Sequence, residues 1–207
     1  MHPDADVLQV DPVTGRRTGL GAYARRALRA LARAEVPYAL VGAAALAVRG
    51  LPRMTRDLDV VVLLEDAFAA IGALEAAGFR SITPVVRSEA PEPMYVLKDR
   101  EANEVDLLVG AGEPESTVVA EAPEASAFGV RARVASLEHL ALMYLYSNQP
   151  RHLGDLARIV TETDIDLVAV ERYLTDVHPE MLPVLHERVR LARQPAPSPA
   201  RPPRRKR

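Results

Sequence analysis

Two aspartates separated by one residue open an apolar run in the stretch TRDLDVVV. Successive side chains of a β-strand point to opposite faces, so Asp57 and Asp59 share one face while Leu58 takes the other. Two like charges side by side on a sheet repel each other, and such a pair is rarely kept for stability alone. We therefore expect a positive partner for the two carboxylates, either a divalent metal ion or the nearby Arg53 and Arg56.

The composition limits the classes of protein to consider. A chain of 207 residues that is 48% hydrophobic and 26% charged can bury a core. It has no cysteine and five scattered histidines, which excludes disulfides and leaves oxygen as the ligand for any metal. No apolar run approaches the ~18 residues of a membrane helix, and the N-terminus lacks a secretory pattern. We expect a cytoplasmic protein without a membrane partner.

Apolar periodicity predicts the order of the secondary-structure elements. The predicted helices cover residues 20–34, 43–50, 65–78, 136–147, 150–163, 166–177 and 179–194. The predicted strands cover residues 37–42, 57–64, 79–86, 94–99 and 104–110, with weaker strands at 116–122 and 128–135. Helices and strands thus alternate in the first two thirds of the chain, and only helices follow.

These patterns divide the chain into four segments. Residues 1–17 are predicted to form a flexible arm, 18–135 an α/β core and 136–193 a helical segment. Residues 194–207 contain five basic and no acidic residues, which predicts a disordered tail and leaves the preceding 193 residues with a net charge of −7. The tail is open to two interpretations, a solvated end or an electrostatic handle for nucleic acid.

A turn suited to phosphate precedes the aspartate pair. Gly42 ends a predicted strand and directly opens a helix, so backbone N–H groups and the positive helix end face the space beyond. Asp57 follows 15 residues later. Asp106, within the otherwise apolar EVDLLV, can supply a third carboxylate. Carboxylates beside such a turn suit a complex of a divalent metal with a triphosphate.

The stretch ALVGAAALAVRGLPRMTRDLDVVV, with the later VDLLV, resembles the nucleotidyltransferase superfamily. Within it, RMTRDLD and LEHLALMYLYSNQPRHLGDLARIV look most like the AbiEii-type (MenT-like) toxins. The resemblance covers roughly residues 20–165. It implies an α/β (α+β) nucleotidyltransferase-like fold, with a mixed sheet flanked by helices and followed by a C-terminal helical segment.

The resemblance also implies roles for individual residues. The backbone at Gly42 and Ala43 would contact the nucleotide phosphates. Asp57 and Asp59 would bind two Mg²⁺ ions, and Asp106 would bind metal and activate the acceptor hydroxyl. The implied partners are an NTP, an RNA end such as that of tRNA or a protein hydroxyl as acceptor, and a possible antitoxin.

The sequence departs from this family at two positions. Ala43 replaces the usual Ser or Gly, and Tyr144 stands where the toxins have a lysine that binds the triphosphate. Arg151 and Asp155 match a second family motif for the nucleotide, although their spacing also fits a salt bridge on a helix surface. The candidates to replace the missing cation are Arg53, Arg56 and Lys98.

Two classes of function therefore remain open. One is a Mg²⁺-dependent nucleotidyltransferase that modifies RNA, a protein or a small molecule such as an aminoglycoside. The other is a catalytically degenerate protein that keeps the fold to bind a nucleotide or a partner. Whether an arginine or Lys98 can reach the triphosphate distinguishes the two.

Overall fold

The computed structural model describes residues 20–86 and 92–194. The predicted arm and all but the first residue of the predicted tail lie outside the described residues. The division of the chain into four segments stays a prediction.

A mixed five-stranded sheet forms the centre of the core. Its strand order is β1-β2-β5-β4-β3, and only β2 and β5 run parallel. A separate hairpin of β6 and β7 touches β1 through a bridge between Leu40 and Val134. The strands are β1 (Ala39–Leu40), β2 (Asp57–Leu63), β3 (Arg80–Ser81), β4 (Met94–Lys98), β5 (Glu104–Gly110), β6 (Glu124–Ala127) and β7 (Val130–Arg133).

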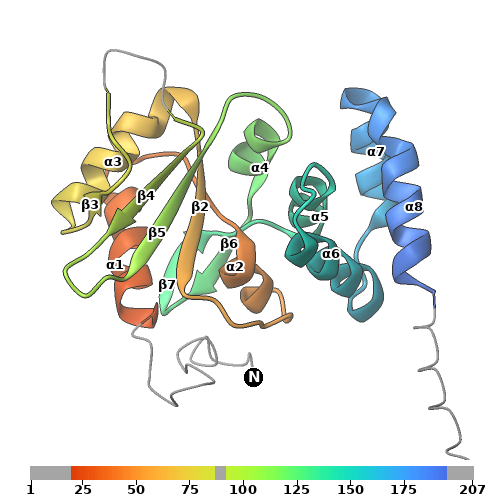
Figure 1. Ribbon diagram of the computed structural model, residues 1–207, viewed down its shortest axis with the longest axis horizontal. Coiled ribbons are helices and arrows are strands. Elements are labelled where there is room, and N and C mark those ends of the chain that lie inside the picture. Colours follow the sequence, from red (N-terminus) through yellow and green to blue (C-terminus); the bar gives the residue numbers. More distant parts are fainter. Residues whose placement is uncertain (1–19, 87–91, 195–207) are drawn as a thin grey trace, which may run out of the picture.

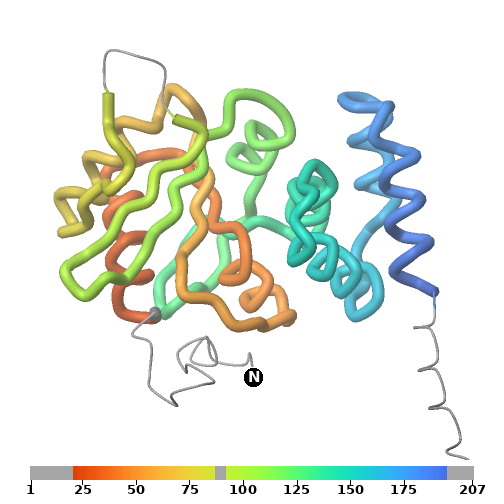
Figure 2. Tube along the Cα trace, viewed as in Figure 1, coloured from red at the N-terminus to blue at the C-terminus, as the bar shows by residue number. Residues whose placement is uncertain are grey.

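Helices flank this sheet and then continue without strands. Figures 1 and 2 show the sheet at one end of the molecule and α5 to α8 at the other. The helices are α1 (Leu20–Arg33), α2 (Gly42–Val48), α3 (Ala67–Ala76), α4 (Glu115–Glu121), α5 (Leu137–Leu145), α6 (Pro150–Glu162), α7 (Leu167–Val177) and α8 (Leu182–Ala192), with short 3₁₀ turns at Leu64–Asp66 and Pro179–Met181. None of the helices within the described ranges is long and apolar enough to cross a membrane.

The two faces of the sheet differ in character. Leu58, Val60 and Leu107 are fully buried on the face that packs against α1 and α3. The opposite face begins with the acidic residues of β2 and β5 and is flanked by α2 and α4. The alternation of Asp57 and Asp59 with Leu58 and Val60 fixes the strand register, because a slip by one residue would turn the carboxylates towards α1 and α3.

The prediction of a strand at 116–122 is wrong, because these residues lie in α4. The β-branched STVV sequence favours a strand, but Pro114 and Glu115 open the segment with helix-starting residues. Val118 and Val119 are then buried on the side of α4 that contacts β2. Tertiary packing therefore overrides the local preference.

Two further differences concern strand boundaries. The strand predicted for 79–86 is only the two-residue β3, and β6 was not predicted at all. Both segments are short and lie at the edges of their sheets, where few apolar side chains mark the pattern.

Candidate active site

Three aspartates converge on the open face of the sheet. Asp59 of β2 lies directly beside Asp106 of β5 in the parallel register. Asp57 lies two residues before Asp59, on the same face of β2. Each offers a carboxylate oxygen, and these oxygens lie within 4.8 Å of one another. The structure thus brings together the three carboxylates that the sequence suggested as metal ligands.

Gly42 makes room for this cluster. Its φ of +60° favours glycine, and a Cβ added there would lie 1.9 Å from Asp59 Oδ2. The backbone N–H of Ala43 donates a hydrogen bond to the Asp59 carboxylate. The contact of the Gly42 and Ala43 backbone with nucleotide phosphates stays a prediction.

The cluster is electrostatically strained. Burial, followed by the charge of Asp57, raises the pKa of Asp59 to about 6. Burial, followed by the charges of Asp59, Glu104 and Asp57, raises the pKa of Asp106 to about 7. Within the described residues, no arginine or lysine forms an ion pair with the three aspartates. Neither Arg53 nor Arg56 forms an ion pair with Asp57 or Asp59, although the charge of Arg53 partly offsets the rise in the pKa of Asp59.

The donor set fits a hard divalent cation. The Thr55 hydroxyl donates a hydrogen bond to Asp57 Oδ1, which orients that carboxylate. Asp106 Oδ1 is buried and finds no hydrogen-bond partner among the described residues. Carboxylate oxygens are ligands that suit Mg²⁺, and the unpartnered Asp106 Oδ1 is available to such an ion.

Arg53 is held in place by Asp155. Its Nε donates to Asp155 Oδ2 at 2.9 Å, and Asp155 is only 4% exposed. Of the two interpretations of Arg151 and Asp155, the salt bridge along α6 does not form, because Asp155 pairs with Arg53 and Arg151 Nε donates to Gln149 Oε1. Asp155 thus lies behind the cleft wall and acts on the site through Arg53.

The remaining predicted cations differ in position. Arg151 lines the cleft described below. Its positive charge offsets part of the rise in the pKa values of Asp59 and Asp106. Arg56 is exposed and does not line it. Lys98 Nζ pairs with Glu104 Oε2 at 2.7 Å, also outside the cleft lining. Of the predicted cations, Arg53 and Arg151 therefore line the cleft.

A cleft of about 340 Å³, which we call the central cleft, opens between the sheet, α4 and the α5–α6 region. Tyr144, the residue at the family lysine position, is 4% exposed and stacks on His152 with ring centroids 4.8 Å apart. Burial, followed by the charge of Asp155, raises the pKa of the Tyr144 hydroxyl. The cleft is lined by Val41, Gly42, Arg53, Asp59, Met94, Asp106, Leu108, Glu115, Met143, Tyr144, Tyr146, Ser147, Gln149, Arg151 and His152.

Sequence reasoning missed part of this wall. Tyr146 and Glu115 were not among the predicted site residues, and the strand predicted for 116–122 begins directly after Glu115. Arg188 of α8 also escaped notice, although its guanidinium donates to the carbonyl oxygens of Tyr144, Leu145 and Ser147 at the end of α5. The signal that could have found Glu115 is the helix start at Pro114; nothing local marks Arg188.

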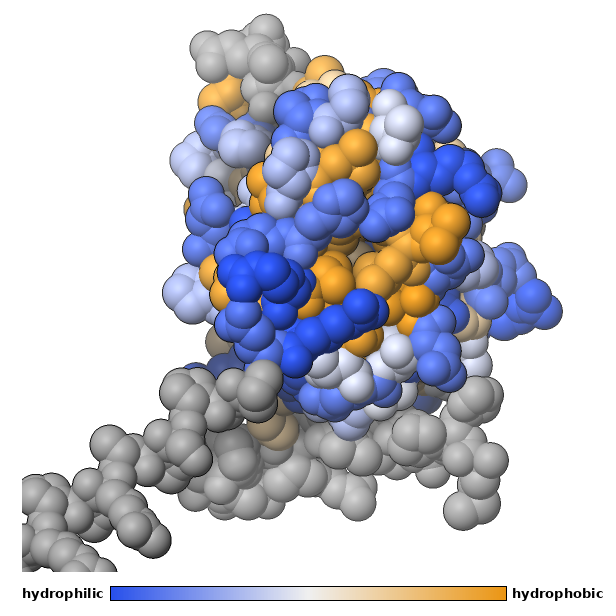
Figure 3. All heavy atoms as spheres, turned by 90° about the vertical axis from the view of Figure 1, so that its right-hand side faces the viewer, coloured by the Kyte–Doolittle hydropathy of each residue, from blue (hydrophilic) through white to orange (hydrophobic). Residues whose placement is uncertain are grey.

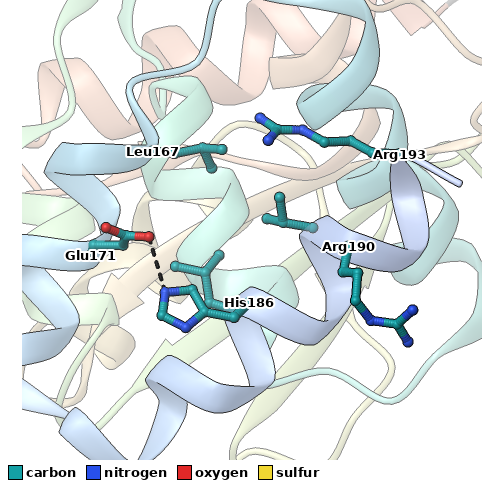
Figure 4. A pocket seen from close by; sticks show the side chains of 7 residues that line it. Leu167, Glu171, His186, Arg190 and Arg193 are labelled. Carbon is teal, nitrogen blue, oxygen red and sulfur yellow. Dashed lines mark hydrogen bonds and ion pairs between the residues drawn. The ribbon is translucent and has the colours of Figure 1, made fainter.

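A second hollow of about 480 Å³ lies between α7 and α8, and apolar side chains gather in it on the face shown in Figure 3. Figure 4 shows His186 beside Glu171, with 3.0 Å between Nε2 and Oε1. Leu167, Arg190 and Arg193 surround them. This hollow shares no lining residue with the central cleft.

No family model and no curated protein matches the sequence. Among solved structures, the fold is similar to a putative nucleotidyltransferase from Thermotoga maritima, with a TM-score of 0.50 and 16% identity over 69% of this chain and 92% of that one. The antibiotic-resistance factor ANT(2'')-Ia gives a TM-score of 0.49 with 20% identity over 84% and 92% of the two chains. The lincosamide antibiotic adenylyltransferase LnuA gives 0.47 with 15% identity over 75% and 99%.

The chain therefore has a nucleotidyltransferase-like α/β fold, with a mixed sheet flanked by helices and four further helices after the core. At these identities the similarity concerns the fold alone, and it does not single out the AbiEii-type toxins.

Proposed function

We propose that the protein transfers a nucleotidyl group from an NTP to the hydroxyl of an acceptor, using divalent metal ions held by Asp57, Asp59 and Asp106. The observation that carries the proposal is the meeting of these three carboxylates, with no cation of the described residues in an ion pair with them, where Asp59 and Asp106 line the central cleft. A binding protein without metal chemistry has no use for such mutual repulsion.

We propose that the three carboxylates hold two Mg²⁺ ions. Asp57 and Asp59 offer carboxylates from one strand, and the unpartnered Asp106 Oδ1 faces them from the next. When bound, Mg²⁺ supplies positive charge to the phosphate oxygens and lowers the barrier to displacement at phosphorus.

The acceptor hydroxyl is activated by Asp106. The Asp106 carboxylate accepts a hydrogen bond from the hydroxyl and takes the proton as the new oxygen–phosphorus bond forms. The bond from the α-phosphorus to the bridging oxygen breaks, and pyrophosphate leaves with that electron pair. Gly42 keeps the backbone close to the cluster without a side chain that would displace Asp59.

In this proposal, Arg53 and Arg151 bind the triphosphate from the wall of the cleft. A guanidinium binds phosphate oxygens in pairs and stays charged, so these two arginines take over the role of the lysine absent at Tyr144. Asp155 keeps the Arg53 guanidinium oriented. Arg56 and Lys98 have no part in this arrangement, since neither lines the cleft.

The resemblance to toxins extends this proposal to an RNA end or a protein hydroxyl as acceptor and to an antitoxin as partner. These points, and the cytoplasmic location, rest on the sequence alone and stay predictions.

Incubation with each α-labelled NTP, Mg²⁺ and a mixture of total RNA and cell extract tests the proposal. We expect the wild-type protein to transfer label and an Asp57→Ala/Asp59→Ala double variant to transfer none. Equal labelling by both proteins would refute the assignment of the site.

The alternative is a protein that binds nucleotide without transferring it. A melting temperature raised by an NTP with Mg²⁺, together with no labelled acceptor, would support this second reading.

A further inference from the structure

His152, at the start of α6, lines the central cleft beside Arg151. The other three histidines of the described residues do not line it, and the ring of each is bound to a neighbour. These pairs are His139 with Ser136, His178 with Glu180 and His186 with Glu171. Their rings serve local contacts, whereas that of His152 is placed to meet a ligand of the cleft.

The imidazole of His152 is held on one face and at one nitrogen. Its ring stacks on Tyr144, with the ring planes inclined by 24°. Nδ1 lies 2.7 Å from the Oγ of Ser147, which also accepts a hydrogen bond from the backbone N–H of Gln149. Nε2 forms no hydrogen bond within the described residues, so it is the ring nitrogen left for a ligand.

The Ser147 hydroxyl suits both protonation states of this ring. It can donate its proton to Nδ1 of the neutral imidazole, or accept a hydrogen bond from Nδ1–H of the charged one. A carboxylate partner, such as Glu171 beside His186, favours the charged ring instead. His152 can therefore gain and lose a proton while its ring keeps the same orientation.

Three charged side chains act on the His152 ring. Burial, followed by the charge of Arg151, lowers the pKa of His152. The charge of Asp155 raises this pKa and that of Arg53 lowers it. A triphosphate bound by the two arginines would bring several negative charges to them, and these charges would favour protonation of the ring beside them.

His152 is also the group of its wall best suited to give up a proton near neutral pH. Of the residues of α5, α6 and their connecting turn that line the cleft, arginine keeps its proton, and serine, glutamine and methionine are not acids in this range. The pKa of Tyr144 is raised, chiefly by burial, and that of Tyr146 is raised to about 12. Imidazole is the side chain whose ordinary pKa lies closest to neutrality.

We propose that His152 is a further catalytic residue, the general acid that protonates the leaving pyrophosphate. Its Nε2–H donates a hydrogen bond to the oxygen that bridges the α- and β-phosphorus atoms. As the bond from the α-phosphorus to this oxygen breaks, the oxygen keeps the electron pair and takes the proton from Nε2, and the ring becomes neutral. This inference rests on the function proposed above and assigns a residue to its departing group.

The basicity of the leaving group tests this role. NTP analogues with CH₂ in place of the β,γ-bridging oxygen release a more basic leaving group than those with CF₂, so they depend more on a proton donor. His152→Gln keeps an N–H near the position of Nε2 but cannot give up its proton. With α-labelled analogues, Mg²⁺ and the acceptor mixture described above, we expect this variant to lose about 100-fold in rate with CH₂ and at most about tenfold with CF₂.

The comparison of the two analogues is made within one protein, so a partly unfolded variant does not distort it. Equal losses with both analogues would overturn the inference, because a structural defect slows both alike. His186→Gln is the matched control, since His186 is a histidine of the same helical segment and does not line the central cleft. It should leave both rates unchanged.

A nuclear magnetic resonance titration of the whole protein needs no acceptor. Inorganic tripolyphosphate with Mg²⁺ is the probe, and the imidazole signals report the pKa of each histidine. We expect the probe to raise the pKa of His152 by about one unit or more and to leave that of His186 unchanged. A probe that binds without raising the pKa of His152 would overturn the inference and leave nucleotidyl transfer intact. Absence of label transfer from every NTP would overturn both.

Discussion

Replacing Asp106 by Asn should stabilise the metal-free protein at neutral and alkaline pH. The pKa of Asp106 is raised from 3.8 to about 7 in the folded protein, first by burial and then by the charges of Asp59, Glu104 and Asp57. The folded state therefore binds this proton more tightly than the unfolded state does. The proton on Asp106 thus stabilises the folded protein. This contribution is complete below about pH 4 and is lost as the pH rises through about 7.

The size of the effect follows from that difference. At about 1.4 kcal/mol per pKa unit, the raised value corresponds to at most about 4 kcal/mol. The Asp106 side chain is only half-buried, so solvent screening reduces this to about 1–2 kcal/mol. Asn keeps the shape of the side chain and cannot ionise, so the Asp106→Asn variant avoids the loss.

Urea unfolding followed by circular dichroism, at about pH 5 and about pH 8, measures the effect. We expect Asp106→Asn to exceed the wild type by about 1–2 kcal/mol at about pH 8 and by much less at about pH 5. Mg²⁺ should stabilise the wild type more than the variant. Asp164→Asn, an exposed change outside the cleft, is the control. A variant no more stable than the wild type at the higher pH would refute the reasoning.

Three further predictions concern the supports of the site. Gly42→Ala should lower the free energy of unfolding by at least about 1–2 kcal/mol, because alanine is strained in the left-handed backbone conformation at this position. It should also abolish label transfer, because the new Cβ would displace the Asp59 carboxylate. Gly72→Ala, which has open space around it, is the control, and equal losses in urea unfolding would contradict the prediction. Asp155→Asn should raise the KM for NTP more than it lowers kcat, because Arg53 loses its 2.9 Å anchor; an unchanged KM in steady-state kinetics would remove Arg53 from the nucleotide site. Arg188→Met should cost about 2–3 kcal/mol of unfolding free energy, since three carbonyl oxygens at the end of α5 lose a charged donor; a thermal melt identical to that of the wild type would refute this role.

The fold was largely predictable because its strongest signals are local. The alternation in DLDVVVL defines β2 and the face on which its carboxylates lie. Helical periodicity gave α1 and α5 to α8 to within a few residues. The exception is α4, where STVV prefers a strand in isolation and only burial against β2 makes it a helix. No local pattern contains that information.

The site was predictable only where chemistry and topology coincide. Asp57, Asp59 and Asp106 were found because buried strands seldom carry acids. The partner of Asp155 was missed because Arg53 lies 102 positions away in the sequence, whereas Arg151 stands at helical spacing. Contacts between distant segments are set by packing of the whole chain, which a local spacing rule does not contain.

The close approach of Gly42 and Asp59 also has an evolutionary consequence. A side chain at position 42 and a carboxylate at position 59 cannot occupy the same space, so the two positions constrain each other during divergence. Descendants that keep the aspartate have to keep the glycine, whereas loss of the aspartate removes the steric reason for it. Variation at position 42 among homologues would thus mark the lineages in which the carboxylate at position 59 has already been lost.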